Sequence, residues 1–187
     1  FSVETIKVAI LGFGTVGQGI YHIINEKKHQ FKEQLGYELE VAKILVTNTD
    51  RERVAGTKHL LTKDINEVLA VPGLQVVFEA IVNEEPAYSY LKAAVQKKCH
   101  VVTANKVMFA KRGEELQELA KQNGVSVGFE AHAVKNRPAS KTDDVARIAF
   151  IIFLPKAELN VIDYINDHLR IDSEYFVYIL NFNQVFL

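Results

Sequence analysis

Apolar runs and amphipathic stretches alternate along the first two-thirds of the chain. Short continuous apolar runs predict buried strands, and stretches with apolar side chains every three or four positions predict helices. In the first such helix, Ile20, Ile24 and Phe31 share one face, and charged side chains lie elsewhere. The predicted strands are 6–11, 40–46, 76–81, 100–102 and 125–129. The predicted helices are 18–34, a short helix capped by Asp64, 85–97 and 113–122.

This alternation predicts an α/β fold. Strands separated by helices imply right-handed crossovers and a mostly parallel sheet, whose strands are buried on both faces. The pattern weakens after Val134, where "KNRPASKTDD" is polar and "DVARIAFIIF" fits either a buried helix or a strand. The tail 175–187 is aromatic and β-branched, which is typical of a strand. We therefore predict one domain over residues 1–134 and a shortened or incomplete second region over 135–187.

Composition narrows the class of protein. The chain has 187 residues with a formal net charge of −1, which argues against a general nucleic-acid surface. Its single cysteine, Cys99, excludes an intrachain disulfide and suits a reducing compartment. No apolar run approaches the ~20 residues that cross a bilayer, and "FSVETIK" does not resemble a signal peptide. We expect a cytoplasmic protein that acts on small molecules.

Three glycines follow the first predicted strand in the spacing G-x-G-x-x-G. Gly12 permits a tight turn, Gly14 lets a pyrophosphate approach the backbone, and Gly17 lets the next helix pack close to the strand. The N-terminus of that helix offers unpaired N–H groups to phosphate. The pattern predicts a Rossmann-type dinucleotide-binding domain. The alternative is a glycine-rich turn used only for packing.

The end of the second predicted strand bears on the choice of cofactor. A carboxylate there binds the ribose hydroxyls of NAD, whereas a basic residue accepts the 2′-phosphate of NADP. The sequence "VTNTDRER" places Thr47 and Asn48 at the strand tip, with Arg51 and Arg53 beyond. Arg51 is thus a candidate cofactor-binding residue that favours NADP. NAD stays open, because these charges could equally form a solvated turn.

The stretches "VAILGFGTVGQGI" and "HVVTANKVMFAKRGEELQELAKQNGVSVGFEA" resemble homoserine dehydrogenase. In that family the glycine loop reads G-x-G-T-V-G, a later strand ends in V-T-A-N-K, and the next strand ends in an aromatic residue followed by E-A. All three motifs occur here in order, over about residues 6–134. The resemblance implies NAD(P)H-dependent reduction of L-aspartate 4-semialdehyde to L-homoserine, on the route to threonine and methionine.

The resemblance also implies roles for individual cofactor-binding residues. Phe13, Thr15 and Val16 would contact the dinucleotide phosphates together with the three glycines. Thr103 and Asn105 would line the nicotinamide side.

Further residues are implied on the substrate side. Lys106, at the end of a parallel strand, would be an active-site lysine whose ammonium orders a water or polarises a carbonyl. Asp144 in "DDVARIAF" would bind substrate. Glu130, with the carbonyl of Ala133, would hold a monovalent cation such as sodium. The alternative for Glu130 is a buried carboxylate paired within the hinge between the two regions.

The sequence departs from the family pattern at three places. Val82 and Asn83 stand where the family has a glycine pair, and "KNRPASK" replaces a glycine-rich turn. Ile148 stands where a catalytic lysine should follow "DDVAR". Either the chain is an internally shortened enzyme or sequence is missing or unreliable after Val134.

Two functions are compatible with this pattern. The first is a homoserine dehydrogenase, expected to be a homodimer because an aromatic tail must be covered. The second is a catalytically inactive, regulatory dinucleotide-binding module, which Ile148 and the missing glycines favour. The intact V-T-A-N-K motif favours the enzyme.

Overall fold

A computed structural model describes residues 4–129 of the chain, nearly all of which belong to one compact unit, Phe1–Val127. The domain boundary predicted after Val134, and every role predicted for residues 130–187, lie outside the described residues. They stay predictions.

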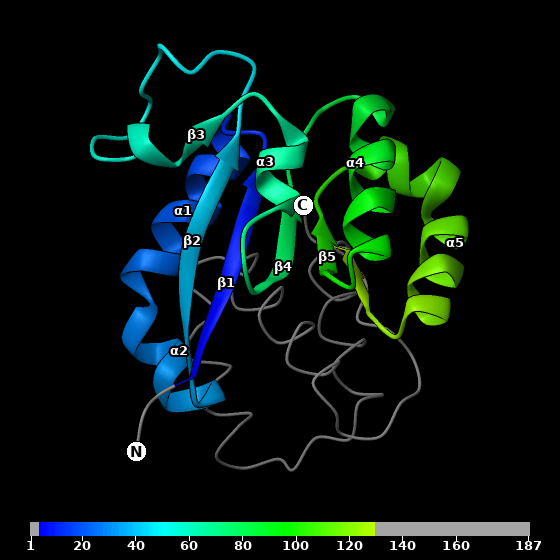
Figure 1. Ribbon diagram of the computed structural model, residues 1–187, viewed down its shortest axis with the longest axis horizontal. Coiled ribbons are helices and arrows are strands. Elements are labelled where there is room, and N and C mark those ends of the chain that lie inside the picture. The colour runs from blue at the N-terminus through cyan, green and yellow to red at the C-terminus, as the bar shows by residue number, and fades with distance from the viewer. Residues whose placement is uncertain (1–3, 130–187) are drawn as a thin grey trace, which may run out of the picture. The chain divides into compact units, whose positions relative to one another are not determined.

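The described residues form a six-stranded sheet with the order β3-β2-β1-β4-β5-β6, of which Figure 1 labels β1 to β5. The pairs β1–β2, β1–β4, β2–β3 and β4–β5 are parallel. The strands are β1 (Glu4–Leu11), β2 (Tyr37–Leu45), β3 (Leu61–Thr62), β4 (Leu74–Glu79), β5 (His100–Thr103) and β6 (Val127–Phe129). The predicted α/β fold with a mostly parallel, Rossmann-type sheet is confirmed.

Helices cover both faces of this sheet. They are α1 (Thr15–Glu26), α2 (Lys28–Leu35), α3 (Ile65–Leu69), α4 (Glu84–Gln96) and α5 (Lys106–Asn123), with a short 3₁₀ helix, η1 (Lys58–Leu60). None of the helices within residues 4–129 is long and apolar enough to cross a membrane.

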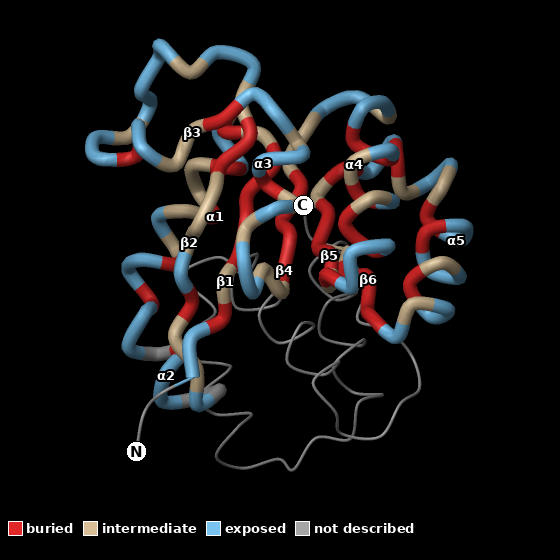
Figure 2. Tube along the Cα trace, viewed as in Figure 1, coloured by how far each residue is buried: buried red, intermediate tan, exposed pale blue. Residues whose placement is uncertain are grey.

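Successive side chains of β1 point to opposite faces of the sheet, so the strand packs against helices on both faces. Ala9 and Leu11 belong to a core cluster that contains buried residues of α4 and α5, such as Leu91 and Leu116. Ile10 points to the opposite face, because a Cβ added to Gly17 of α1 would lie 3.5 Å from its Cγ2. Strands β4 and β5 accordingly have no exposed residue, and exposed residues lie mostly on helices, loops and the amino ends of β1 and β2 (Figure 2).

Most element boundaries differ from the predictions by one to three residues, and the helices differ more. Helix α5 begins at Lys106, seven residues before the predicted start, because the side chain of Asn105 caps it by accepting from the Met108 N–H at 2.9 Å. Gly113 looked like a helix boundary but lies inside α5. The helix predicted over 18–34 begins at Thr15 and is divided at Lys27. Strand β3 and η1 were not predicted.

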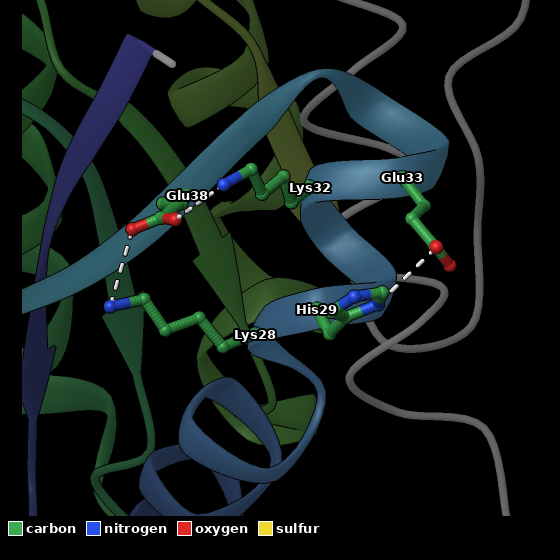
Figure 3. A network of polar contacts seen from close by, with 5 residues as sticks. All are labelled: Lys28, His29, Lys32, Glu33 and Glu38. Atoms are coloured by element: carbon green, nitrogen blue, oxygen red, sulfur yellow. Dashed lines mark hydrogen bonds and ion pairs between the residues drawn. The ribbon is translucent and has the colours of Figure 1, made fainter. Parts of the chain in front are cut away.

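A polar network ties α2 to the amino end of β2 (Figure 3). The Glu38 carboxylate is 3.2 Å from Lys28 Nζ and 3.4 Å from Lys32 Nζ, and the hydrogen bond from Lys28 contributes most to lowering the pKa of Glu38. A separate pair, His29–Glu33 at 3.4 Å, lies on α2 itself. Because parallel strands place ligands at their carboxyl ends, this network lies at the edge away from a cofactor.

Two contacts hold α5 against α4. The Arg112 guanidinium lies 3.7 Å over the ring of Tyr88, and its hydrogen bond to Glu115 is the main cause that lowers the pKa of Glu115 to about 2. Lys111 Nζ pairs with Glu84 at 2.7 Å. The start of α5, which carries Lys106, is therefore fixed relative to the start of α4.

Candidate dinucleotide-binding site

The loop after β1 turns at Gly12. Its φ of +90° is a conformation that residues with side chains rarely adopt, and an added Cβ would lie 2.8 Å from the carbonyl oxygen of Ala80. The Gly12 N–H donates to the carbonyl of Leu45 at 2.9 Å. The carboxyl ends of β1, β2 and β4 thus meet at this glycine.

Gly17 and Gly14 serve different purposes. A Cβ on Gly17 would lie 2.0 Å from the carbonyl oxygen of Gly12, so only glycine fits where α1 crosses the loop. A Cβ on Gly14 would meet no heavy atom within 4 Å, and Gly14 begins α1 with no side-chain cap hydrogen bond. A turn used only for packing needs Gly12 and Gly17 but gives no reason for Gly14. Open space over an uncapped helix N-terminus fits a phosphate.

Phe13 contributes its backbone rather than its ring to this loop. The ring is buried and lies edge-on to Tyr21, with centroids 5.9 Å apart. Its carbonyl oxygen accepts from Gln18 Nε2 at 3.0 Å and from Arg53 Nη1 at 2.8 Å. A phosphate contact by Phe13, predicted from the sequence, would therefore use the main chain.

Arg53, rather than Arg51, reaches the glycine loop. Arg51 is exposed in the segment after β2, whereas the Arg53 guanidinium crosses to the Phe13 carbonyl. Both arginines stood out in the sequence, but their spacing alone did not show which one contacts the loop. The predicted role of Arg51 stays a prediction, and Arg53 joins the candidate site.

Glu79 ends β4 and is fully buried. Its Oε1 accepts from the Ile81 N–H at 2.5 Å and its Oε2 accepts from Thr103 Oγ1 at 2.5 Å. Burial raises the pKa of this carboxyl, and the hydrogen bonds only partly offset that effect. Sequence reasoning missed Glu79, although a charged residue inside the predicted apolar strand 76–81 was a usable signal.

Thr103 and Asn105 continue the polar network from Glu79. The Thr103 hydroxyl accepts from the Asn105 N–H at 3.0 Å. The Asn105 amide caps α5 through Oδ1 and donates from Nδ2 to the Asn83 carbonyl at 2.8 Å. The structure brings both residues to the predicted edge of the sheet. Their contact with nicotinamide stays a prediction.

Lys106 occupies the first position of α5 and is exposed. A cation at a helix N-terminus is disfavoured by the helix dipole, and the first turn of α5 holds no acidic residue to offset it. A lysine at this position therefore does not stabilise α5. Its ammonium group is suited to bind a ligand that carries a negative charge or a polarised carbonyl.

Three valines that follow neighbouring strands are exposed large hydrophobic residues of the described part of the chain. Val16, Val82 and Val107 expose 46%, 85% and 53% of their surfaces. They follow β1, β4 and β5, which are neighbours in the sheet, so all three lie along its carboxyl edge. An apolar edge beside one lysine is suited to a flat organic ring next to a polar reacting group.

The remaining predicted site residues lie elsewhere. Glu130, Ala133 and Asp144 fall outside the described residues. Within residues 4–129, no group of three or more His, Cys, Asp or Glu side chains could hold a metal ion. Cys99 is buried just before β5, at the opposite edge of the sheet, and burial raises its thiol pKa. Such a buried thiol is a poor nucleophile.

The sheet order, the glycine loop before α1 and the polar groups at the carboxyl edge define a Rossmann-type dinucleotide-binding domain. Residues 12–130 match the family model described as the NAD-binding domain of homoserine dehydrogenase. The chain belongs to the homoserine dehydrogenase family, which confirms the resemblance drawn from the sequence motifs.

Individual relatives agree with this assignment. The chain is 37% identical over 140 residues to homoserine dehydrogenase of Bacillus subtilis, covering 74% of this chain and 32% of that protein. It is 33% identical to the Lactococcus lactis homoserine dehydrogenase, covering 74% and 33% respectively. A crystal structure of S. aureus homoserine dehydrogenase superposes with a TM-score of 0.65 at 35% identity, covering 70% of this chain and 33% of that one. The chain therefore spans about a third of the length of the relatives it matches.

Proposed function

We propose that this chain supplies the cofactor-binding part of an enzyme that reduces L-aspartate 4-semialdehyde to L-homoserine. The observation that carries the proposal is Gly14, which has open space over an uncapped helix N-terminus at the carboxyl edge of the sheet. NADPH or NADH, when bound there, supplies a hydride to the aldehyde carbon.

The chain's own residues would orient the reactants and stabilise charge. The backbone N–H groups at the start of α1 would bind the pyrophosphate. Lys106 would act beside the aldehyde oxygen, where negative charge develops, and Asp144 would bind the substrate's ammonium group. We further propose, as the resemblance to the family implies, a homodimer and a monovalent cation at Glu130 and the Ala133 carbonyl.

A catalytically inactive regulatory module is the weaker candidate. Val82 and Asn83 replace the glycine pair of the family, and the side chain of Val82 is exposed. The exposed Lys106 favours the enzyme, because binding a dinucleotide gives less need for that lysine.

Isothermal titration calorimetry of NADPH and NADH tests the proposal. We expect the chain to bind at least one cofactor, and we expect Gly14→Val to abolish the binding heat, because the side chain fills the space that the phosphates need. Gly19→Val is the matched control, since Gly19 lies in α1 with open space around it and away from the loop. Equal affinities for all three proteins, or no binding by any, would refute the site.

The two arginines after β2 should have different effects on cofactor choice. Arg51→Ala should weaken NADPH about tenfold and leave NADH unchanged, because only the 2′-phosphate needs this charge. Arg53→Ala should weaken both cofactors, because the Phe13 carbonyl loses its contact and the loop is less well held. The measurement is the ratio of NADPH to NADH dissociation constants. An unchanged ratio in Arg51→Ala removes Arg51 from the site.

A further inference from the structure

Glu79 lies where three loops of the site converge, and nothing assigned so far uses it. Its carboxylate bonds the Ile81 N–H, in the loop after β4, and the Thr103 hydroxyl, at the end of β5. Its own carbonyl accepts from the Ala104 N–H at 3.0 Å. Side chain and backbone of this one residue therefore join the carboxyl ends of β4 and β5.

The backbone next to Glu79 contacts the glycine loop. The next residue, Ala80, donates from its N–H to the Leu11 carbonyl at 2.8 Å. The carbonyl of Ala80 lies against Gly12, where it excludes any side chain. Both contacts are made by the backbone of Ala80, so they hold this loop against Gly12 independently of the Glu79 side chain.

On the other side, Glu79 is connected to the start of α5. The Thr103 hydroxyl, which bonds Glu79, also accepts a hydrogen bond from the Asn105 N–H. The Asn105 side chain in turn caps the helix that begins with Lys106. The Asn105 amide also holds the loop of Val82 and Asn83 through the Asn83 carbonyl. The chain of bonds from Glu79 thus reaches both Lys106 and Val82.

The Glu79 carboxyl group loses its hydration on burial, and the donors that compensate for this loss come from the loop after β4 and from the end of β5. An apolar side chain would leave both donors without this acceptor. The Ile81 N–H can only donate, and the Thr103 hydroxyl, which accepts from the Asn105 N–H, has its own proton left to donate, so one carboxylate satisfies both groups.

We propose that Glu79 is a positioning residue for the nicotinamide half of the cofactor. It holds the loops after β4 and β5, which carry Val82 and Lys106, in register with each other. The inference rests on the proposed function, because it assumes that a dinucleotide lies across this edge. In this fold the adenosine half lies toward β2, so the opposite half extends over β4 and β5. Disturbing Glu79 should then affect one half of the cofactor and spare the other.

The test compares NADPH with 2′-phospho-ADP-ribose, which is the same molecule without nicotinamide, by calorimetry on the 187-residue chain. Glu79→Gln keeps the size of the side chain but removes its charge and replaces one of the two acceptor oxygens with an NH₂ group. We expect it to weaken NADPH about tenfold, as for the loss of a buried charged hydrogen bond, and to change 2′-phospho-ADP-ribose less than twofold. Equal weakening of both ligands, or no change in either, overturns the inference while leaving cofactor binding intact.

Control variants separate this role from a general loss of structure. Glu38→Gln makes the same chemical change in the network at the opposite edge and should leave both affinities unchanged (Figure 3). If Glu79→Gln does not fold, Thr103→Val decides, because it removes the hydroxyl that links Glu79 to Asn105. It should reproduce the selective loss of NADPH affinity, and Thr103→Ser, which keeps the hydroxyl, should restore most of it. If the unmodified chain binds neither ligand, the proposed function fails, and this inference fails with it.

Discussion

Gly17→Ala is expected to lower the free energy of unfolding by about 3 kcal/mol, the upper end of the range for overpacking. The new Cβ would lie 2.0 Å from the carbonyl oxygen of Gly12, and neither backbone segment is free to move. Gly12 is itself bonded to Leu45 and packed against Ala80. The higher helix propensity of alanine compared with glycine offsets only about 1 kcal/mol of this loss. Urea unfolding followed by circular dichroism measures the difference.

Gly19→Ala is the matched control for this prediction. Gly19 lies in the same helix, and a Cβ there meets no atom within 4 Å. Alanine should therefore stabilise the chain by about 1 kcal/mol. If Gly17→Ala proves as stable as Gly19→Ala, the close crossing of α1 over the loop is wrong.

Ile148→Lys is expected to raise the rate of aspartate semialdehyde reduction by about 10²–10⁴-fold, the usual contribution of a general acid. The family resemblance places a lysine there beside the carbonyl oxygen, and isoleucine has no proton to donate. The chain with Ile148 should therefore bind cofactor but reduce the aldehyde slowly or not at all. The measurement is NADPH oxidation in the presence of aspartate semialdehyde. Full activity with Ile148 in place would show that "DDVARIAF" is wrongly aligned with the family.

A second substitution in the Ile148→Lys background tests Lys106. Lys106→Met should remove most of the gained rate, because the exposed lysine at the carboxyl edge would no longer stabilise the developing charge. Lys121→Met removes an exposed lysine in the last turn of α5, away from the carboxyl edge, and should retain the rate. Inactivity of every variant with cofactor binding intact would favour the regulatory module.

Much of this domain could be predicted because its strands and its glycine loop depend on residues that are close together in the sequence. Buried parallel strands appear as continuous apolar runs, so the five strands of the prediction correspond to β1, β2, β4, β5 and β6. Strand β3 has only two residues and could not be detected from any periodicity. The glycine spacing depends on close backbone contacts within six residues, and the structure shows those contacts at Gly12 and Gly17.

The polar network at the carboxyl edge could not be predicted in the same way. Its partners lie far apart in sequence: Glu79 and Thr103 are separated by 24 residues, and Phe13 and Arg53 by 40. Spacing along the chain carries no information about which strand tips meet. The start of α5 was missed for a related reason. Asparagine is common in loops, and only the structure shows that the Asn105 amide caps the helix.

The hydrogen bond from the Asn105 amide to the Asn83 carbonyl, here called the tether, affects which substitutions the two positions can tolerate. The Asn105 amide holds position 83 by its main-chain carbonyl, which every amino acid possesses, so the hydrogen bond does not depend on the side chain there. The amino acid at position 105 cannot be exchanged so freely. Its side chain must accept a hydrogen bond from the Met108 N–H and also donate one to the Asn83 carbonyl. Evolution can thus exchange the glycine pair for Val82 and Asn83 without losing the tether. Exchanges at 105 should be tolerated only together with a second change that replaces the cap.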